Sequence, residues 1–444
     1  MASVRSDTNK CVECPAGKTN YAAGETTCTY AFSTAAAPDY LQDGLNLVEA
    51  KVNIQALFKL PHADEFSGED TITCTQTKYR SADGTCTTVA VPLDGAANTP
   101  FGRLLDVDFT YTVDDPPAAA VAEAFLHRPA NASRVSSLAH SAMMTAWIQF
   151  MIHDWIQHSD TSYNGENYTE LNKYSSWADC SQLYGNNQAE QDKVRTGVGG
   201  LVKVGEDALL RDGNGVPITG VTINWWAGVE MMHVIFHKEH NSIAAALASA
   251  YPSMDDEALF QTARLVVSAL VTKIHATQWT PPLFNHPAIN AGLQFGWDQS
   301  EETQKYVNSQ ILGDDPRLVA VVKYYASTIQ PGKRLTSRHS LTELFTTVYR
   351  LHATLPDAIT GIGQMLELTS HAKSGEVLKQ SGLKGVVDGF MATPMALNRL
   401  NNYPDFFRET QMAEIDVSRD RQRGVGRCEC GRRSNLGPTD PRID

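Results

Sequence analysis

Apolar residues recur at three- and four-residue spacing along most of this chain from about residue 135 onward. That spacing places them on one face of a helix and therefore predicts amphipathic helices. The predicted helices cover residues 138–158, 225–250, 255–278, 301–311, 317–329, 341–354 and 358–367. Turn signals dominate between about 36 and 130, and the alternation typical of strands is scarce throughout. The pattern predicts a mainly α fold.

The helix predicted at 138–158 carries the first candidate chemistry. Gln149 and His153 are four residues apart and share a helix face, whereas Asp154 is rotated away from them. Their surroundings are apolar because the segment also contains Trp147, Phe150, Met151 and Trp155. Gln149 and His153 would then face a dry cofactor pocket, with a metal site behind it at Asp154. A histidine satisfied within an ordinary core is the alternative.

Composition narrows the classes of function. The chain has 444 residues, of which 42% are hydrophobic, enough to bury a large core. Its net charge of −13, with no concentrated basic face, argues against nucleic-acid binding. No run of 18 or more apolar residues occurs, so no membrane-spanning helix is predicted. Peripheral membrane association and the oligomeric state stay open.

The cysteines are typical of an oxidising compartment. Cys11, Cys14 and Cys28 lie in a short Gly/Thr/Asn-rich segment that resembles part of a disulfide-stapled module, with a zinc site as the rival interpretation. Cys74 and Cys86 flank a turn-rich loop and could close a disulfide. The N-terminus lacks the apolar stretch of a secretory signal. We expect a secreted or secretory-pathway protein, with the compartment still open.

Tyr349 and His352 form a second candidate pair. They are three residues apart within the helix predicted at 341–354 and would share its face. A phenol beside a metal-ligating imidazole would let an oxidised cofactor draw an electron and a proton from the tyrosine. An amphipathic helix with a buried tyrosine is the alternative. His275 is a further candidate, with an ordinary helix histidine as its alternative.

The segment Ser175–Ser181 alternates oxygen-bearing side chains with other residues. Together with a carboxylate from elsewhere, such a segment could form an all-oxygen cage, which suits calcium better than zinc or copper. The ligands would be Asp154, Ser175, the backbone carbonyl of Trp177, Asp179 and Ser181. A simple Ser/Asp-rich turn is the alternative.

From about residue 70 to residue 433 the chain resembles the animal-type haem peroxidase superfamily, because several motifs occur in that family's order. They are Tyr79-Arg80, Asp83 to Cys86, Gly95 to Pro100, Gln149 to Asp154, Ser175 to Gly185, Lys238 to Asn241, Asp256 to Phe260 and Met391 to Pro394. The resemblance implies a helical fold around a buried haem. It implies His153 as the distal haem histidine, His352 as the proximal iron ligand, and the oxygen cage as a calcium site.

Within that superfamily, the chain resembles the fatty-acid oxygenases more than the peroxidases. Peroxidases place an arginine three residues before the proximal histidine, whereas cyclooxygenases and α-dioxygenases place a tyrosine there, here Tyr349. The distal arginine of peroxidases corresponds to Thr222. The carboxylates that attach haem covalently in mammalian peroxidases correspond to Ile152 and Trp225. The resemblance therefore implies haem b that is held noncovalently.

The strongest similarity is to the plant α-dioxygenases, through the motifs Asn224 to Gly228 and Lys273 to Thr280. It implies that His275 and Thr280 bind a fatty-acid carboxylate. An arginine completes that anchor in the family, and the spacing of the C-terminal basic run makes Arg432 or Arg433 its counterpart.

Two further positions follow from the same resemblance. Asp416 would hydrogen-bond the proximal histidine, where peroxidases have asparagine, and would make the iron more electron-rich. Arg419 would pair with a haem propionate. Residues 428–431 and 434–444 depart from the family's pattern.

The resemblance implies a haem-dependent dioxygenase that adds O2 to the α-carbon of long-chain fatty acids and gives 2-hydroperoxy fatty acids. A hydroperoxide would activate the haem with the help of Gln149 and His153, and a radical at Tyr349 would abstract the α-hydrogen. A haem peroxidase acting with hydrogen peroxide and an inactive secreted binding protein are the alternatives.

Three regions are predicted along the chain. Residues 1–35 form a Cys-rich disulfide module, and residues 36–433 form the haem peroxidase/dioxygenase-like domain, shortened at its C-terminal end. Residues 434–444 form an unrelated tail.

Overall fold

The computed structural model describes residues 3–5, 11–13, 18–19, 29–30, 72–74, 78–87, 91–102, 118–128, 132–158, 162–163, 168–169, 171–284, 340–342, 345–346, 349 and 351–404. The chain divides into two compact units, residues 1–60 with 314–337 and residues 61–313 with 338–444. In the first unit, β1 (Ser3–Arg5) pairs with β2 (Cys11–Glu13), and β3 (Lys18–Thr19) pairs with β4 (Thr29–Tyr30), both antiparallel. The Cys-rich module stays a prediction, since Cys14 and Cys28 lie outside the described residues.

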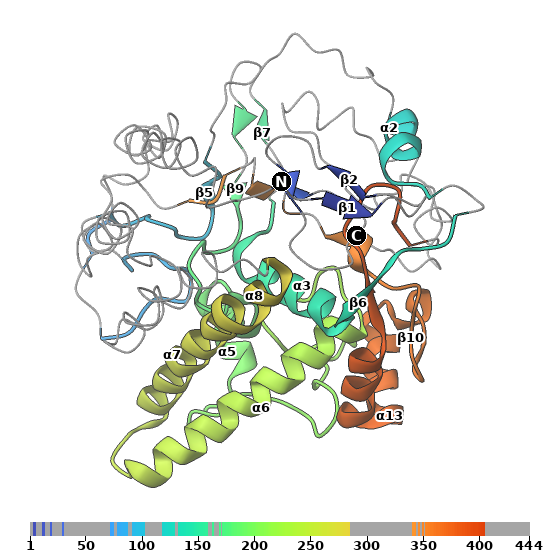
Figure 1. Ribbon diagram of the computed structural model, residues 1–444. Coiled ribbons are helices and arrows are strands. Elements are labelled where there is room, and N and C mark those ends of the chain that lie inside the picture. The colour runs from blue at the N-terminus through green and yellow to red at the C-terminus, as the bar shows by residue number, and fades with distance from the viewer. Residues whose placement is uncertain are drawn as a thin grey trace, which may run out of the picture. The chain divides into compact units, whose positions relative to one another are not determined.

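Four helices frame the second unit. They are α3 (Met143–Trp155), α6 (Ala227–Ala250), α7 (Asp256–Ile274) and α13 (His371–Ala392). Figure 1 shows α7 beside α6, with α13 packed against the opposite end of α6. The described part of the chain holds no helix with the length and apolar character that crossing a membrane requires.

Short elements surround this frame. The smaller helices are α2 (Ala118–Phe125), α4 (Ser181–Tyr184) and α5 (Gln188–Val194). All described strand pairs of this unit are antiparallel and two-stranded: β5 (Thr99–Pro100) with β9 (Leu171–Asn172), β6 (Ser136–Ser141) with β12 (Pro394–Ala396), β7 (Ser162–Tyr163) with β8 (Tyr168–Thr169), and β10 (Ala358–Ile359) with β11 (Gly363–Gln364). The predicted disulfide joins Cys74 to Cys86.

An aromatic core lies where α3 packs on α6. Phe150 stacks on Phe236 with ring centroids 5.2 Å apart, and Trp147 lies 5.7 Å from Phe236. Each fully buried aromatic side chain stabilises the fold by about 2–3 kcal/mol. Because these rings fix the rotation of α3, they also fix where its polar residues Gln149 and His153 point.

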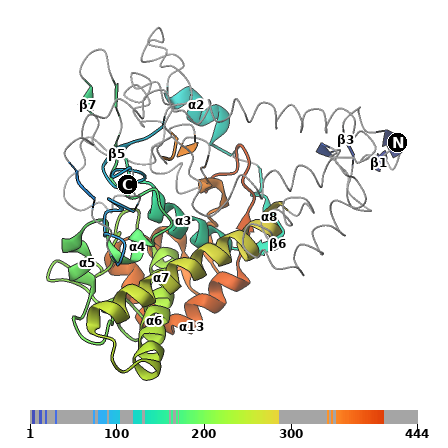
Figure 2. The same ribbon diagram turned by 90° about the vertical axis from the view of Figure 1, so that its left-hand side faces the viewer.

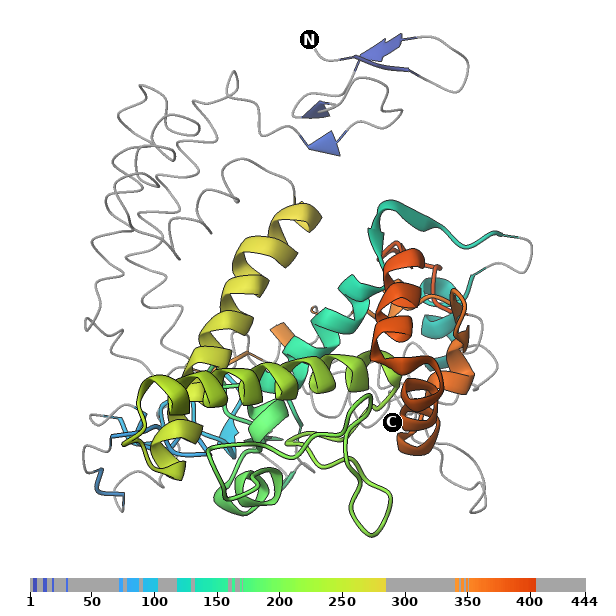
Figure 3. The same ribbon diagram turned by 90° about the horizontal axis from the view of Figure 1, so that it is seen from below.

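Helix α7 begins as its sequence predicts. The Asp255 side chain accepts a hydrogen bond from the backbone N–H of Ala258 (2.8 Å), and Asp256 and Glu257 occupy the positively polarised first turn. At its C-terminal end α7 passes into a π-helical turn, η4 (His275–Trp279), and then into α8 (Thr280–Phe284). Figures 2 and 3 show α7 and α8 as one continuous rod.

The predicted helices at 138–158 and 358–367 are wrong in part or in whole. The helix predicted from residue 138 starts only at Met143, because residues 136–141 pair with β12 as strand β6. The helix predicted at 358–367 is instead the β10–β11 hairpin followed by the 3-10 turn η7 (Met365–Leu368). Gly361, with a φ of +72°, makes the hairpin turn that a helix could not accommodate.

Helix α13 has no counterpart among the predicted helices. Its apolar pattern is diluted by four glycines, and Gly382 adopts a φ of +70° that kinks the helix. Gly389 lies so close to the β10–β11 hairpin that a Cβ there would be 2.7 Å from Cγ1 of Ile362. The glycines therefore serve tertiary packing rather than helix propensity. The helices predicted at 301–311 and 317–329 lie outside the described residues.

Candidate functional site

Gln149 is half-buried on α3 and is held by two hydrogen bonds. Its Oε1 accepts from the indole N–H of Trp226 (2.7 Å), and its Nε2 donates to the backbone carbonyl of Asn224 (2.8 Å). Nε2 also lies 3.4 Å from Nε2 of His153. The shared helix face predicted for Gln149 and His153 is confirmed, and the loop before α6 orients that face.

His153 is a buried, neutral imidazole. Its side chain is 3% exposed, and burial lowers its pKa to about 4. Nδ1 accepts or donates no hydrogen bond among the described residues. A neutral histidine in an apolar setting can take up a proton when a substrate or ligand supplies one, which suits a general base.

A buried carboxylate, Glu230, anchors the loop that binds Gln149. It accepts from the Trp225 indole (3.0 Å), from Ser374 (2.6 Å) and from the guanidinium of Arg211 (2.7 Å). Asn224, in the left-handed region with a φ of +48°, then turns the chain so that its carbonyl faces Gln149. Sequence reasoning missed Glu230, although an acidic residue within the apolar first turns of a helix is itself a signal for a buried polar network.

Asp154 points away from His153 toward the Ser175–Ser181 loop, as predicted. Its Oδ1 accepts from the backbone N–H of Ser181 (2.7 Å). Oδ1 of Asp179 accepts from the same N–H (3.1 Å) and from the Ser181 hydroxyl (2.6 Å). Two fully buried carboxylates therefore converge on one residue.

The other oxygens of this pair explain why it suits a cation. Oδ2 of Asp154 and Oδ2 of Asp179 are both buried and accept no hydrogen bond from a described residue. Burial and the nearby charge of Asp179 raise the pKa of Asp154 well above its usual value. Such a pair is costly unless a cation compensates it. Among the described residues no cluster of three His, Cys, Asp or Glu side chains exists, so hydroxyl and carbonyl oxygens would have to complete any site.

The serine and tryptophan positions lie in the same loop. Oγ of Ser175 accepts from the backbone N–H of Trp177 (3.1 Å), and the Trp177 carbonyl accepts from Asp179 (2.9 Å). Gly84 approaches so closely that a Cβ there would be 2.9 Å from Oγ of Ser175. The disulfide-closed loop at Cys74–Cys86 thus packs directly on this loop.

Tyr349 and His352 do not share a helix, which corrects the prediction for 341–354. Tyr349 closes a turn through its N–H to the Phe345 carbonyl (2.9 Å), but Leu351 is non-helical and His352 opens the short 3-10 turn η6 (His352–Thr354). Tyr349 is half-buried and stacks on Phe345 with centroids 4.8 Å apart. Burial raises the pKa of Tyr349 to about 12, so its phenol keeps its proton.

The segment that carries His352 is fastened to α3. Thr145, on the same helix face as Gln149 and His153, donates to the Thr354 carbonyl (3.1 Å). Arg134 donates to the Ala353 carbonyl (3.0 Å) and pairs with Asp357 (2.9 Å). The fold therefore brings together the elements of both predicted haem histidines, although they are far apart in sequence.

His275 and Thr280 lie at the π-helical turn, beside α3. The Trp147 indole donates to Nδ1 of His275 (3.2 Å), and the ring of His275 stacks on Trp279 (4.9 Å). The Thr280 hydroxyl donates to the His275 carbonyl (2.8 Å). Burial lowers the pKa of His275 to about 4, so it is neutral and, since Nδ1 accepts, carries its proton on Nε2.

The remaining predicted positions divide into two groups. Thr222 and Trp225 lie in the described loop before α6, and the Thr222 carbonyl accepts from His371 (2.7 Å). No arginine occupies the Thr222 position, and Ile152 and Trp225 carry no carboxylate. Asp416, Arg419, Arg432 and Arg433 lie outside the described residues.

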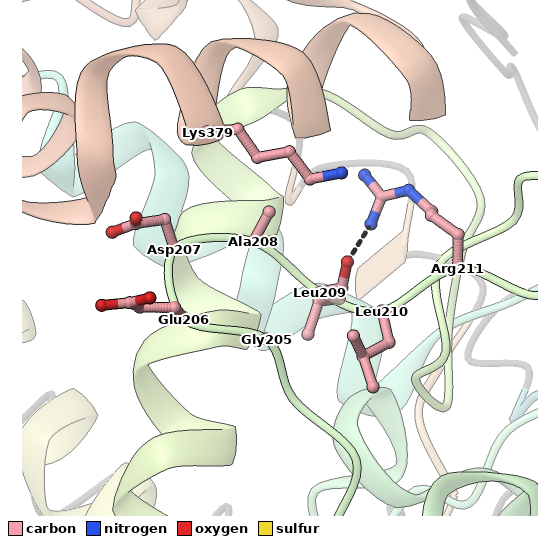
Figure 4. Close-up of a pocket in the computed structure, with 8 residues that line it drawn as sticks. All are labelled: Gly205, Glu206, Asp207, Ala208, Leu209, Leu210, Arg211 and Lys379. Atoms are coloured by element: carbon pink, nitrogen blue, oxygen red, sulfur yellow. Dashed lines mark hydrogen bonds between the residues drawn. The ribbon is translucent and has the colours of Figure 1, made fainter.

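A cavity of about 440 Å³ lies elsewhere, between the Gly205–Arg211 loop and α13. Figure 4 shows Lys379 and Arg211 pointing toward each other while Glu206 and Asp207 point away. None of the predicted site residues lines this cavity. Its rim carries both acidic and basic side chains. It connects to the site indirectly, through the Arg211–Glu230 ion pair.

Comparisons with known proteins give matches over most of this chain. The sequence matches the animal haem peroxidase family over residues 79–170 and 159–427. Alpha-dioxygenase PIOX of Oryza sativa subsp. japonica is 28% identical over 87% of this chain and 71% of its own length. Alpha-dioxygenase 2 of Arabidopsis thaliana is 28% identical over 79% of this chain and 64% of its own. The chain spans about two thirds of the length of these relatives.

Solved structures show the same similarity. A fatty acid alpha-dioxygenase from Arabidopsis thaliana aligns with a TM-score of 0.68 and 27% identity, over 80% of this chain and 65% of that one. The Oryza sativa enzyme, solved with palmitic acid, aligns with a TM-score of 0.65 and 26% identity, over 78% and 66%. Peroxidase A of Dictyostelium discoideum shares the fold, with a TM-score of 0.54 and 16% identity over 79% and 77%.

Proposed function

The chain belongs to the animal haem peroxidase family, and we propose that it is a haem-dependent dioxygenase that adds O2 to the α-carbon of long-chain fatty acids. The product would be a 2-hydroperoxy fatty acid. The observation that carries the proposal is the presence of Tyr349, His275 and Thr280 in a chain that matches fatty-acid α-dioxygenases over most of its length.

The described residues fit a haem. His352 would ligate the iron, and His153 would act on the hydroperoxide at the same haem; the Thr145–Thr354 hydrogen bond, which joins α3 to the His352 segment, supports this assignment. Asp416 and Arg419 would complete the binding of haem b without a covalent link. When bound, the haem would supply the oxidant that takes an electron from Tyr349.

His153 and Gln149 would handle the hydroperoxide that activates the enzyme. His153 is neutral because burial lowers its pKa to about 4, so it could accept the hydroperoxide proton. Gln149 cannot titrate, and its bonds to Trp226 and Asn224 hold it one helical turn from His153. Gln149 would therefore orient rather than exchange protons.

Tyr349 would remove the α-hydrogen of the fatty acid. Its phenol is protonated at neutral pH, since burial raises its pKa to about 12, and therefore holds the hydrogen atom that a radical mechanism must first remove. O2 would then add to the carbon radical. Regioselectivity requires that the α-carbon lie beside Tyr349, because an alkyl chain offers no other handle.

The carboxylate would be anchored at the π-helical turn. His275 offers an N–H at Nε2, because its Nδ1 accepts from Trp147. The Thr280 hydroxyl currently donates to the His275 carbonyl and would exchange that bond for the carboxylate. Arg432 would add the charge that pairs with the carboxylate. The similarity to an α-dioxygenase solved with palmitic acid supports this class of substrate.

Calcium is the cation we propose for the Asp154–Asp179 pair. Both unpartnered Oδ2 atoms are available, and Ser175, Ser181 and the Trp177 carbonyl would add neutral oxygens. An all-oxygen set of this kind favours calcium over zinc or copper. Since Asp154 directly follows His153, the cation would fix the end of α3 that carries the histidine.

Oxygen uptake with palmitate, compared with guaiacol oxidation by hydrogen peroxide, tests the proposal. The haem-reconstituted full chain should consume O2 only with the fatty acid and should yield the 2-hydroperoxide by mass spectrometry. Guaiacol oxidation without palmitate-dependent uptake would assign a peroxidase instead. Failure to develop a Soret band on addition of haem would favour a binding protein.

A further inference from the structure

The orientation of the Gln149 amide determines where the proton of His153 lies. An indole N–H can only donate, so Trp226 must face Oε1, and a carbonyl can only accept, so Asn224 must face Nε2. The second N–H of the amide then points to Nε2 of His153, 3.4 Å away. Nε2 of His153 is therefore the acceptor, and the neutral ring carries its proton on Nδ1.

That proton needs an acceptor. Nδ1 of His153 is buried and has no hydrogen-bond partner among the described residues. Leaving a buried N–H without an acceptor is energetically unfavourable. A nearby buried acceptor that itself lacks a hydrogen-bond donor would satisfy this N–H.

His233 on α6 is such a group. Thr219 Oγ1 lies 2.7 Å from Nδ1 of His233, 3.3 Å from Nε2 of His237 and 3.2 Å from the Gln182 carbonyl. His237 donates from Nδ1 to the Lys203 carbonyl (3.2 Å), so its Nε2 is an acceptor.

The single hydroxyl proton of Thr219 fixes the direction of these bonds. If the Thr219 hydroxyl donates its proton to the Gln182 carbonyl or to His237, Nδ1 of His233 can donate to the Thr219 oxygen. Two of the three contacts of Thr219 are then hydrogen bonds. If Thr219 gives it to His233, neither of the other two acceptors receives a proton from Thr219. The first arrangement is favoured, and it leaves Nε2 of His233 as a bare acceptor, which is buried and has no partner among the described residues.

The two unpartnered atoms are complementary and lie on packed helices. His153 offers an N–H and His233 a lone pair, and the ring of Phe150, one turn before His153, contacts His233 edge-on with centroids 5.3 Å apart. Burial, followed by the charges of His237 and His153, lowers the pKa of His233 well below its usual value, so its lone pair is retained.

We propose that His233 is a positioning residue for His153, accepting the hydrogen bond of its Nδ1–H through one buried water molecule. The two nitrogens make no direct hydrogen bond, and the charge of His153 acts on the His233 ring, so the proposal places one water molecule between them. Gln182, on α4, is fully buried next to Thr219, and both polar atoms of its side chain lack described partners. The effect is to keep Nε2 of His153 unprotonated and facing Gln149. The catalytic consequence rests on the proposed function; the tautomer does not.

Two substitutions at one position separate the positioning role from packing. His233→Gln retains an acceptor for the water and an N–H for Thr219, whereas His233→Leu fills similar space without either. Ring-¹⁵N-histidine NMR of the full chain, without haem and as the ferrous carbon monoxide complex, reports the tautomer of His153. The wild type and His233→Gln should hold the proton on Nδ1, and His233→Leu should shift it toward Nε2. Activation by hydroperoxide should fall about tenfold in His233→Leu, with KM for palmitate unchanged.

His240→Gln is the matched control. His240 is buried on the same helix, but its ring bonds to Tyr184 (2.9 Å) and to the Gly200 carbonyl (2.8 Å), outside the His153–His233 pair. It should leave the tautomer of His153 unchanged. A wild-type His153 protonated on Nε2, or a His233→Leu protein with the wild-type tautomer and activation rate, would overturn the proposal. Absence of oxygen uptake in the wild type would refute the function while the NMR result still decides the role of His233.

Discussion

Trp147 links the two halves of the site at the level of single residues. Its ring packs on Phe150 and Phe236, and its indole N–H determines the tautomer of His275. In a similar way, the indole N–H of Trp226 determines the orientation of the Gln149 amide. Each indole has an apolar ring that the core buries and one donor that orients a polar partner. The chemistry of the site therefore depends on core residues that touch no substrate.

Tyr349→Phe should lower palmitate-dependent oxygen uptake by at least about two orders of magnitude, because the phenol hydrogen that the radical requires is gone. The Soret band should be unchanged, since the ring and its stacking on Phe345 remain. Tyr403→Phe is the control: that ring stacks near His352, with centroids 6.5 Å apart, and should keep its activity. Uptake that survives Tyr349→Phe would refute the radical assignment.

Chelation of calcium should lower the free energy of unfolding, because the Asp154–Asp179 pair then loses its compensating charge. The loss would be about 2.7 kcal/mol relative to the protein in free calcium at about 100 times the Kd. Thermal unfolding with calcium and with EDTA measures it. Asp179→Asn should remove the dependence on calcium, whereas Asp192→Asn, at an exposed position on α5, should retain it. Identical melting with and without chelator would argue against the site.

At the scale of elements, α7 could be predicted because its sequence alone supplies the N-cap, the acidic first turn and the apolar face. The boundary between β6 and α3 could not, because residues 136–141 become a strand only by pairing with β12, more than 250 residues later. The same holds for Tyr349 and His352, whose connection breaks helical geometry at Leu351. Their three-residue spacing therefore does not place them on one helix face, and their proposed roles rest on the family resemblance.

Replacing two glycines of α13 by alanine should have opposite effects on stability. Gly389→Ala should destabilise the protein by about 1–3 kcal/mol, because its Cβ would lie 2.7 Å from Ile362 and 2.8 Å from the Thr360 carbonyl. Gly385→Ala should stabilise it by up to about 1 kcal/mol through helix propensity, since its nearest contact is 3.5 Å away, at Ser381. Urea denaturation compares the two; equal effects would contradict the packing assigned to α13.

At the scale of the whole molecule, buried neutral histidines make stability depend on pH. Burial lowers the pKa values of His153, His237 and His240 to about 4 each, below the usual 6.5. The unfolded chain therefore binds more protons between these values, so stability is present above pH 6.5 and is lost as pH falls toward 4.

Melting of the calcium-saturated protein should accordingly drop between pH 7 and pH 5. Each of the three histidines should lower the free energy of unfolding by roughly 2 kcal/mol by pH 4.5, because it is protonated in the unfolded chain and neutral in the folded one. His153→Gln should reduce the slope by about one proton, because glutamine does not titrate. A melting temperature that stays constant from pH 7 to pH 5 would contradict the buried, neutral state of these rings.

By itself the sequence determined the residue types and local spacings: the Gln149–His153 face, the oxygen-rich loop, the helix from residue 255 and the resemblance to the family. These depend on helix geometry and side-chain chemistry over a few neighbouring positions. Only the tertiary structure decided which groups meet: Trp147 with His275, Thr145 with Thr354, and Asp154 with Ser181. It also decided which polar atoms stay unpaired, because a hydrogen bond to a residue 27 to 209 positions away depends on packing that local sequence does not encode.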